Sequence, residues 1–254
     1  MQTPSVVVVM PVYNEADTAR EAIERVLRVE VSGVDLRLLI IESSSTDGTR
    51  AIVEGFEGDP RVSIVYQEAA RGKGHAVREA FAHVGDEIIL IQDADLEYDT
   101  ADYGKLLAPI LSGDSTFVLG SRHVPGEPIR TMAGEPLSSF VTNIGHAFFC
   151  WVFNVVYRVS LSDPFTMYKV FPASAVQGMR FSCNRFDFDW ELAAKLIRTG
   201  HRPLEIPVAY TSRGFKQGKK VRMFRDPLTW LWAALRFRVV PVGSFTGGER
   251  EPGT

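Results

Sequence analysis

The sequence predicts an α/β fold with a mostly parallel, doubly wound sheet flanked by helices. Between residues 5 and 92, short β-branched apolar runs alternate with segments of helical period, as in sheets with crossover helices. A polar motif follows directly after each of the four apolar runs in this region. The chain has 254 residues, 45% hydrophobic and 23% charged, which suits one large domain with a sizeable core.

The first half of the chain repeats one unit, an apolar run followed by a helix. Ser5 to Met10 is rich in valine and ends at Pro11, as expected of a buried strand. Apolar residues at helical spacing then predict a helix over Glu15 to Val29. Further strands are predicted at 36–41, 62–66 and 87–92, and helices at 74–82 and around Ile52, the latter capped by Thr46 or Asp47.

The second half is less regular. A strand is predicted at 117–120 and another, of alternating character, at 204–210. Helices are predicted at 137–157, which is rich in Phe and Trp, at 187–199, which stops at Gly200, and at 227–240, which is amphipathic. The Gly-rich segment 243–254 is expected to be a flexible tail.

Charge and hydropathy narrow the classes of partner. The net charge of −3 argues against a nucleic-acid partner, but Lys195 to Arg238 holds eleven basic and two acidic residues, a net +9. Such a stretch indicates an anionic partner, either ligand phosphates or lipid headgroups. The most apolar late stretch, His146 to Tyr157, is shorter than the roughly 20 residues of a membrane span, so no transmembrane helix is predicted.

The chain start and the cysteines indicate a cytoplasmic protein. The first residues lack a basic segment, and their apolar run is too short for a signal peptide. Cys150 and Cys183 belong to no metal-ligand motif and are typical of reduced thiols.

The strongest chemical motif is Asp93-Ala94-Asp95. It follows an apolar run, and two carboxylates at a strand end can hold Mg²⁺ or Mn²⁺ against a diphosphate. Glu97 continues the alternation and is a candidate third ligand. The alternative is a solvated turn that caps a helix.

Three loops suit a nucleotide. Pro11-Val12-Tyr13-Asn14-Glu15 takes the place of the glycine motif of dinucleotide-binding folds, and it offers an aromatic ring, an amide and a carboxylate for a base and ribose. Glu42 ends the second strand and can accept hydrogen bonds from ribose hydroxyls. Arg71-Gly72-Lys73-Gly74 supplies a cation for phosphate. Each loop could instead be a plain turn or helix cap.

Taken in order, PVYNE, ESSSTDGT, RGKG, QDADLE, LGSR and SDPFTMYKVF resemble the family 2 glycosyltransferases of the GT-A fold. The dolichyl- or polyprenyl-phosphate sugar synthase branch is the most similar, and the resemblance spans roughly residues 5 to 240. It implies an inverting transfer from a UDP- or GDP-sugar to a polyprenyl phosphate, assisted by Mn²⁺ or Mg²⁺. It also implies one domain over 1–242, with a nucleotide-sugar and metal half at 1–122 and an acceptor half at 123–242.

The resemblance assigns roles to individual residues. Asp93, Asp95 and Glu97 would surround the metal, and Asp163 would lie near the sugar. Asp189, at the start of a late helix, is the candidate general base, and helix capping is its alternative role. The nucleotide and its phosphates would be bound by Pro11, Tyr13, Glu15, Glu42, Lys73, Asp93 and Arg122. Independently of the resemblance, the Gly/Lys-rich loop 213–220 offers Lys219 and Lys220, which could close over phosphates.

Other functions stay open at this stage. Residues 134–140 contain no Arg or Lys, where lipid-phosphate synthases carry arginines, so a soluble enzyme acting on a small molecule is the main alternative. A non-catalytic nucleotide-sugar-binding protein is another. If the acceptor is a lipid phosphate, the helix at 227–240 would lie on the cytoplasmic membrane surface as a peripheral contact, and packing against the core is the alternative for that helix.

Overall fold

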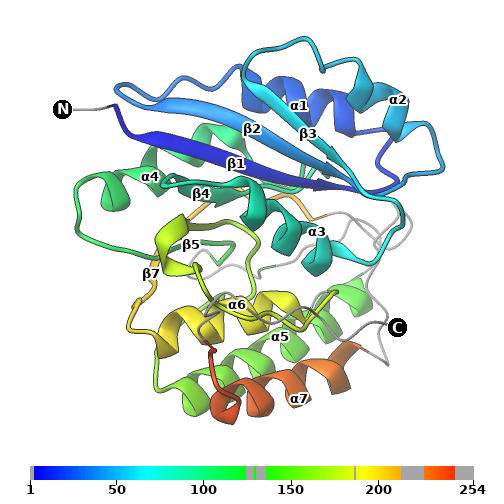
Figure 1. Cartoon of the computed structure of the whole chain (residues 1–254). Helices are drawn as coiled ribbons and strands as arrows, with labels where there is room; N and C mark the ends of the chain where they lie inside the picture. The colour runs from blue at the N-terminus through cyan, green and yellow to red at the C-terminus, as the bar shows by residue number, and fades with distance from the viewer. Residues whose placement is uncertain (1–2, 124–128, 130–135, 186, 213–225, 244–254) are drawn as a thin grey trace.

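The computed structural model describes residues 3–123, 129, 136–185, 187–212 and 226–243. Its centre is a seven-stranded sheet of order β3-β2-β1-β4-β6-β5-β7 (Figure 1). All neighbouring pairs are parallel except those of β6, which runs antiparallel to both β4 and β5. The strands are β1 (Ser5–Val12), β2 (Asp35–Glu42), β3 (Val62–Tyr66), β4 (Ile88–Ile91), β5 (Val118–Ser121), β6 (Lys169–Pro172) and β7 (Leu204–Pro207).

Helices connect and cover these strands. The connection from β1 to β2 contains α1, that from β3 to β4 contains α3, and that from β4 to β5 contains α4, as the predicted alternation requires. The helices are α1 (Ala19–Leu27), α2 (Thr49–Glu54), α3 (Lys73–Ala80), α4 (Tyr103–Leu111), α5 (Pro136–Tyr157), α6 (Phe188–Arg198) and α7 (Asp226–Val239), with short 3₁₀ turns η1 (Phe81–His83), η2 (Thr100–Asp102) and η3 (Ala173–Ala175).

The core follows the hydrophobic pattern of the sequence. Val6 to Met10 of β1 and Leu38 to Ile41 of β2 are fully or almost fully buried, because both strands lie inside the sheet and helices cover its two faces. Continuous apolar runs, rather than alternating ones, are typical of such strands. The predicted α/β class and its doubly wound, mostly parallel sheet are therefore confirmed.

Several boundaries differ from the prediction for local reasons. The helix predicted from Glu15 begins at Ala19, because the Glu15 carbonyl accepts from the amides of Thr18 and Ala19 in a preceding turn. The strand predicted over 204–210 ends at Pro207, although Tyr210 still forms an isolated bridge with Tyr98. The sequence reading also missed α4 and β6, and a four-residue strand gives little periodic signal.

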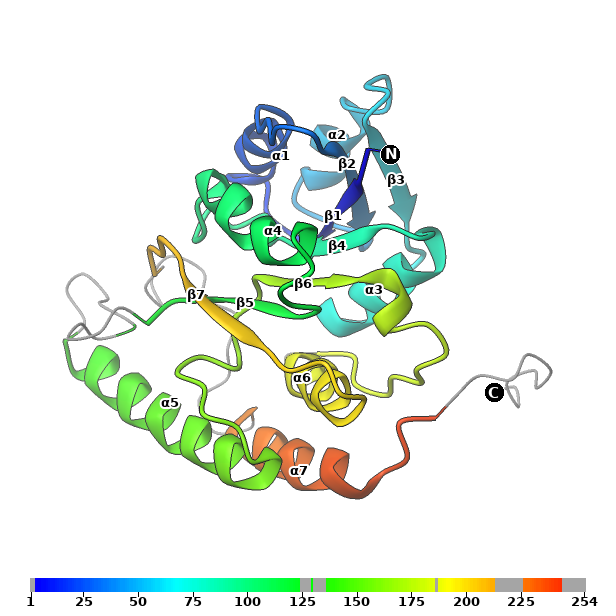
Figure 2. The same cartoon turned by 90° about the vertical axis from the view of Figure 1, so that its left-hand side faces the viewer.

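Three late helices form a separate layer. In both views α5, α6 and α7 lie together at the end of the molecule opposite α1 and α2 (Figures 1 and 2). Trp190 of α6 meets Phe149 and Phe153 of α5 with ring centroids 5.7 and 5.8 Å apart. The Tyr157 hydroxyl of α5 donates to the Ala234 carbonyl of α7 at 2.8 Å. Aromatic packing thus joins α5 to the rest of the domain.

Candidate functional site

The predicted site residues gather where the parallel strands end. Pro11 lies at the end of β1, Glu42 at the end of β2, Asp93 just after β4 and Arg122 just after β5. Because β6 is antiparallel, its first residue, Lys169, comes to the same edge. Ligands of doubly wound sheets bind beyond this edge, so the topology assembles one site from segments distant in sequence.

The first two polar loops are joined by hydrogen bonds. The Asn14 amide donates to Ser45 Oγ at 3.0 Å, and the Thr46 amide donates to Asn14 Oδ1 at 2.8 Å. The Glu15 amide donates to Thr49 Oγ1 at 2.9 Å. Asn14 has φ 51°, a left-handed conformation that asparagine tolerates better than most residues. The two loops therefore form one rigid wall, with the Tyr13 ring 40% exposed beside it.

Glu42 is fully buried and shapes its own loop. Its carboxylate accepts from the amides of Ser44 at 3.2 Å and Ser45 at 2.7 Å. Asp47 also accepts from the backbone, since its Oδ1 accepts from the amide of Thr49, the first residue of α2. The predicted cap at Asp47 thus contacts the helix start, although Gly48 is the capping residue. The predicted ribose contact of Glu42 stays a prediction.

Lys73 and Asp93 form the central ion pair. Lys73 Nζ lies 2.5 Å from Asp93 Oδ1 and 2.6 Å from Oδ2, and the two side chains are only 19% and 16% exposed. Burial by itself lowers the Lys73 pKa, but the carboxylates of Asp93, Asp189 and Asp95 raise it above its usual value. Lys73 is therefore a cation held among three acids.

The metal prediction fits Asp93 and Asp95 better than Glu97. Mg²⁺ is commonly held by one or two carboxylates together with substrate phosphates, and these two acids follow a buried strand as that chemistry requires. Glu97 instead accepts from the Tyr210 hydroxyl at 2.8 Å. Within the described residues, no three acids, histidines or cysteines are gathered as a ready metal cluster. The metal role of Asp93, Asp95 and Glu97 remains a prediction.

Asp189 meets a lysine that sequence reasoning did not assign. Lys169 Nζ lies 3.1 Å from Asp189 Oδ1, with the lysine side chain fully buried. Burial lowers the Lys169 pKa, and Asp189 opposes that shift. The lysine also donates to the Thr166 carbonyl. The ion pair fixes the Asp189 carboxylate at the start of α6. In the sequence, only the motif DPFTMYK drew attention to Lys169.

Arg122 and Asp163 are bound to each other. Arg122 Nε and Nη2 each donate to the carboxylate at 2.7 Å, and the Arg122 amide adds a third bond at 3.0 Å. Burial by itself raises the Asp163 pKa, but the guanidinium lowers it well below its ordinary range. Both side chains are nearly inaccessible. Their predicted separate contacts, with phosphate and with sugar, remain predictions, and the observed role is a buried pair.

A second buried pair holds the loop beside Lys73. The Glu191 carboxylate accepts from the amides of Ser182 at 2.9 Å and Cys183 at 2.7 Å, and Lys195 neutralises it at 2.7 Å. The loop that Glu191 fixes contacts the first turn of α3, where the His75 backbone amide donates to the Asn184 carbonyl. Through this loop, helix α6 supports the start of α3, where Lys73 lies, and it also carries Asp189.

Gly74→Ala is expected to lower the free energy of unfolding by about 1–3 kcal/mol, because a methyl group there overpacks the contact between α3 and the start of α6. An added Cβ would collide with the Phe188 side chain and lie 2.9 Å from the Cys183 carbonyl oxygen. Chemical denaturation measures the change. The matched control is Gly104→Ala in α4, where nothing lies within 4 Å, and which should stabilise by about 0.5–1 kcal/mol. Equal effects would contradict this account.

Lys73→Met is expected to change metal and donor affinity in opposite directions. Removing the ammonium frees Asp93 from its cation, so Mn²⁺ alone should bind more tightly. A nucleoside diphosphate would no longer have the Lys73 ammonium to pair with and should bind about tenfold more weakly, a change of about 1.4 kcal/mol in binding free energy. Calorimetry with Mn²⁺ and with a nucleoside diphosphate separates the two effects. A fall in both affinities would instead indicate a damaged site.

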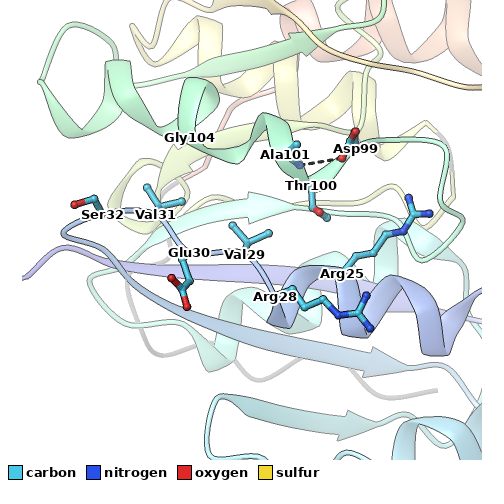
Figure 3. A pocket seen from close by; sticks show the side chains of 10 residues that line it. All are labelled: Arg25, Arg28, Val29, Glu30, Val31, Ser32, Asp99, Thr100, Ala101 and Gly104. Carbon is cyan, nitrogen blue, oxygen red and sulfur yellow. Dashed lines mark hydrogen bonds between the residues drawn. The ribbon is translucent and has the colours of Figure 1, made fainter.

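Two features lie apart from this site. The predicted phosphate contacts Lys219 and Lys220 are outside the described residues. A surface hollow between the end of α1 and the start of α4 holds none of the predicted residues (Figure 3). Its arginines, Arg25 and Arg28, are paired with Glu21 at 2.5 Å and Glu24 at 2.7 Å. The hollow therefore offers no free cation for a phosphate.

Comparison with known proteins decides the family. Residues 7–161 match the family described as Glycosyl transferase family 2. The chain belongs to this family. It is 27% identical over 215 residues to "Glycosyltransferase AglJ" of Haloferax volcanii, covering 84% of this chain and 65% of that protein. It is also 26% identical over 123 residues to the "Dolichol-phosphate mannosyltransferase" of Pyrococcus furiosus, covering 48% and 34%. The chain thus spans less than two thirds of either relative.

Solved structures agree on the fold of this family member. The glucosyl-3-phosphoglycerate synthase of Mycobacterium tuberculosis, in complex with Mn²⁺, UDP and phosphoglyceric acid, superposes with a TM-score of 0.67. The match covers 94% of this chain and 80% of that one at 16% identity. The predicted GT-A fold and the predicted resemblance to the polyprenyl-phosphate sugar branch of the family are therefore confirmed.

Proposed function

We propose that this glycosyltransferase transfers a sugar, with inversion, from a UDP- or GDP-linked donor to a polyprenyl phosphate. The observation that carries the proposal is the convergence of Lys73, Asp93 and Asp189 at the carboxyl edge of the sheet. A cation beside acids suits a sugar diphosphate, whose leaving group is an anion and whose acceptor needs orientation.

The residues divide the work as follows. The wall built from the Asn14 and Ser45 loops bounds the nucleotide, with the exposed Tyr13 ring available for the base and Pro11, Glu15 and Glu42 beside it. Lys73 leaves Asp93 and pairs with the diphosphate. The acceptor oxygen attacks the anomeric carbon, and the bond from that carbon to the diphosphate breaks as the nucleoside diphosphate leaves with the electron pair.

Mn²⁺ or Mg²⁺ held by Asp93 and Asp95 would neutralise charge on the diphosphate. Asp189 would act toward the acceptor. The ion pair with Lys169 holds the Asp189 carboxylate in place, which suits either proton removal from a hydroxyl or orientation of an acceptor that is already an anion.

Two classes of acceptor are supported by different observations. The similar Pyrococcus protein is named for a dolichol-phosphate acceptor, which favours a lipid phosphate. Such an acceptor would place the reaction at the cytoplasmic face of a membrane. The structurally similar Mycobacterium synthase was solved with phosphoglyceric acid, which keeps a small phosphorylated acceptor as the second candidate.

The test has two stages. Calorimetry with UDP-, GDP- and dTDP-sugars, with Mn²⁺ or with EDTA, identifies the donor. Turnover of that donor is then measured with a polyprenyl phosphate and with 3-phosphoglycerate. We expect one donor to bind only with metal and the lipid to be glycosylated. If only 3-phosphoglycerate is glycosylated, the acceptor is a small phosphorylated molecule and not a lipid. If none of the donors shows metal-dependent binding, the proposal is refuted.

Asp189→Asn is expected to lower kcat by about 10²–10⁴ with little change in donor affinity, if Asp189 acts on the acceptor. The matched control is Asp187→Asn, which removes a carboxylate from the same helix start, where Asp187 accepts from the Arg185 amide. Steady-state kinetics and donor calorimetry separate the effects. A similar loss in both variants would indicate that Asp189 only stabilises the helix start.

A further inference from the structure

The outward side of α5 carries an exposed apolar stripe. At about 100° per residue, its seven exposed large apolar side chains fall within an arc of about 100°, along roughly 27 Å of helix. No Asp, Glu, Lys or Arg occurs anywhere in α5. The seven residues are Leu137, Phe140, Val141, Ile144, Phe148, Trp151 and Val155, with Leu137 at 73% and Trp151 at 63% exposure.

Helix α7 extends the stripe. Its residues Trp232, Leu235 and Val239 are exposed and, at helical spacing, share one side of the helix. The two helices lie next to each other in Figure 1, and in Figure 2 they meet near the end of α5, where the Tyr157 hydroxyl donates to the Ala234 carbonyl. We call these ten residues the α5–α7 apolar face. They are ten of the thirteen exposed large apolar residues within the described parts of the chain.

Cations border this face. Arg236 stacks on the Trp232 ring at 4.5 Å, Arg238 donates to the Val156 carbonyl at 3.1 Å, and exposed Arg158 directly follows α5. Apolar and aromatic side chains rimmed by arginines suit the surface of an anionic bilayer, where the rings enter the interface and the cations meet headgroups. A second copy of the chain would bring another set of arginines to the same rim.

The inner side of α5 is covered by the protein. Ser139 to Tyr157 is long and apolar enough to cross a membrane by length and composition, with 22% of the segment buried. That buried part includes Phe149 and Phe153, whose rings pack on Trp190 of α6. A spanning orientation would break this packing. The helix therefore has one side for the protein and one for the partner, as interfacial helices do.

We infer that the α5–α7 apolar face docks on an anionic lipid bilayer with both helices flat on its surface. The inference deepens the proposed function and rests on it for the lipid acceptor. Asp189 faces the site and its neighbour Trp190 packs on the inner side of α5, so α6 and then α5 lie between the reacting groups and the bilayer.

Vesicle sedimentation tests the inference without any acceptor lipid. The probes are vesicles of phosphatidylcholine with and without phosphatidylglycerol. Wild type is expected to bind the anionic vesicles, and the double variant Ile144→Glu/Trp151→Glu at least tenfold more weakly. The matched control Leu111→Glu/Leu204→Glu changes two exposed apolar residues elsewhere and should bind like wild type. Arg236→Gln should weaken binding to the anionic vesicles only.

Other outcomes overturn the inference. Wild type that stays in the supernatant with both vesicles refutes it, as does equal binding by all variants. Wild type could instead bind neither vesicle and be a dimer by light scattering. If the Ile144→Glu/Trp151→Glu variant is then a monomer, the α5–α7 apolar face joins two copies of the chain. Donor calorimetry on each variant is independent of lipid. Donor binding without vesicle binding refutes this inference alone, and the converse refutes the proposed function alone.

Discussion

Asp95→Ala is expected to reduce sugar transfer by on the order of 10³, because a divalent cation supplies several kcal/mol of charge stabilisation at a departing diphosphate. The Mn²⁺-dependent part of donor binding should disappear with it. Asp95 follows the buried strand β4, two residues after the acid that pairs with Lys73. Steady-state rates across a Mn²⁺ titration, together with donor calorimetry, measure both effects.

The control for this variant is Asp99→Ala. Asp99 lies four residues further on, is exposed, and accepts from the Ala101 amide at 3.0 Å. Its loss removes a cap from η2 and should leave transfer near the wild-type rate. Wild-type transfer by Asp95→Ala at saturating Mn²⁺ would refute the assignment of Asp95 to the metal.

Asp163→Asn is expected to lower the free energy of unfolding by about 3–5 kcal/mol, because it leaves the buried Arg122 guanidinium without its counter-charge. The double variant Arg122→Met/Asp163→Leu removes both charges, and its free energy of unfolding should fall much less. Urea denaturation followed by circular dichroism measures each change. Glu54→Gln, in the exposed pair with Arg50 at 3.2 Å, serves as control and should cost less than about 1 kcal/mol.

The same pair predicts a pH dependence. The Asp163 pKa is lowered in the folded protein, so the stabilisation is complete above the unfolded value of about 3.9 and is lost as the pH falls toward the lower folded value. The difference between wild type and Asp163→Asn should therefore shrink below about pH 4. A difference that is constant with pH would show that the ionised carboxylate is not what stabilises the fold.

The Asp163→Asn variant also distinguishes a role of Asp163 in binding the sugar from a structural role in the Arg122–Asp163 pair. If Asp163→Asn unfolds like wild type yet loses transfer, Asp163 acts on the sugar, as the family resemblance implies. If it is destabilised as expected, the pair is an anchor between the end of β5 and the loop before β6. Glu205 supports the anchor by accepting from the amides of Ser162 and Asp163, both at 2.7 Å.

The sequence alone determined the fold class and the edge at which the site forms. Buried parallel strands appear in the sequence as continuous apolar runs, such as Val6 to Met10, because both of their faces are covered. The motif after each strand must then lie at the carboxyl edge of the sheet. Pro11, Glu42, Asp93 and Arg122, each at or just after the end of a parallel strand, therefore lie at one edge of the sheet. The order of these motifs also identified the family.

Only the tertiary structure decided which charges meet and which surfaces stay uncovered. The antiparallel β6 brings Lys169 to Asp189, and α3 brings Lys73 to Asp93, although 20 residues separate the members of each pair. Pairing depends on where chain segments cross, which local periodicity does not record. Likewise, the sequence shows that α5 is apolar, but only packing against Trp190 reveals which side is covered. Burial belongs to the folded chain, whereas hydrophobicity belongs to the residue.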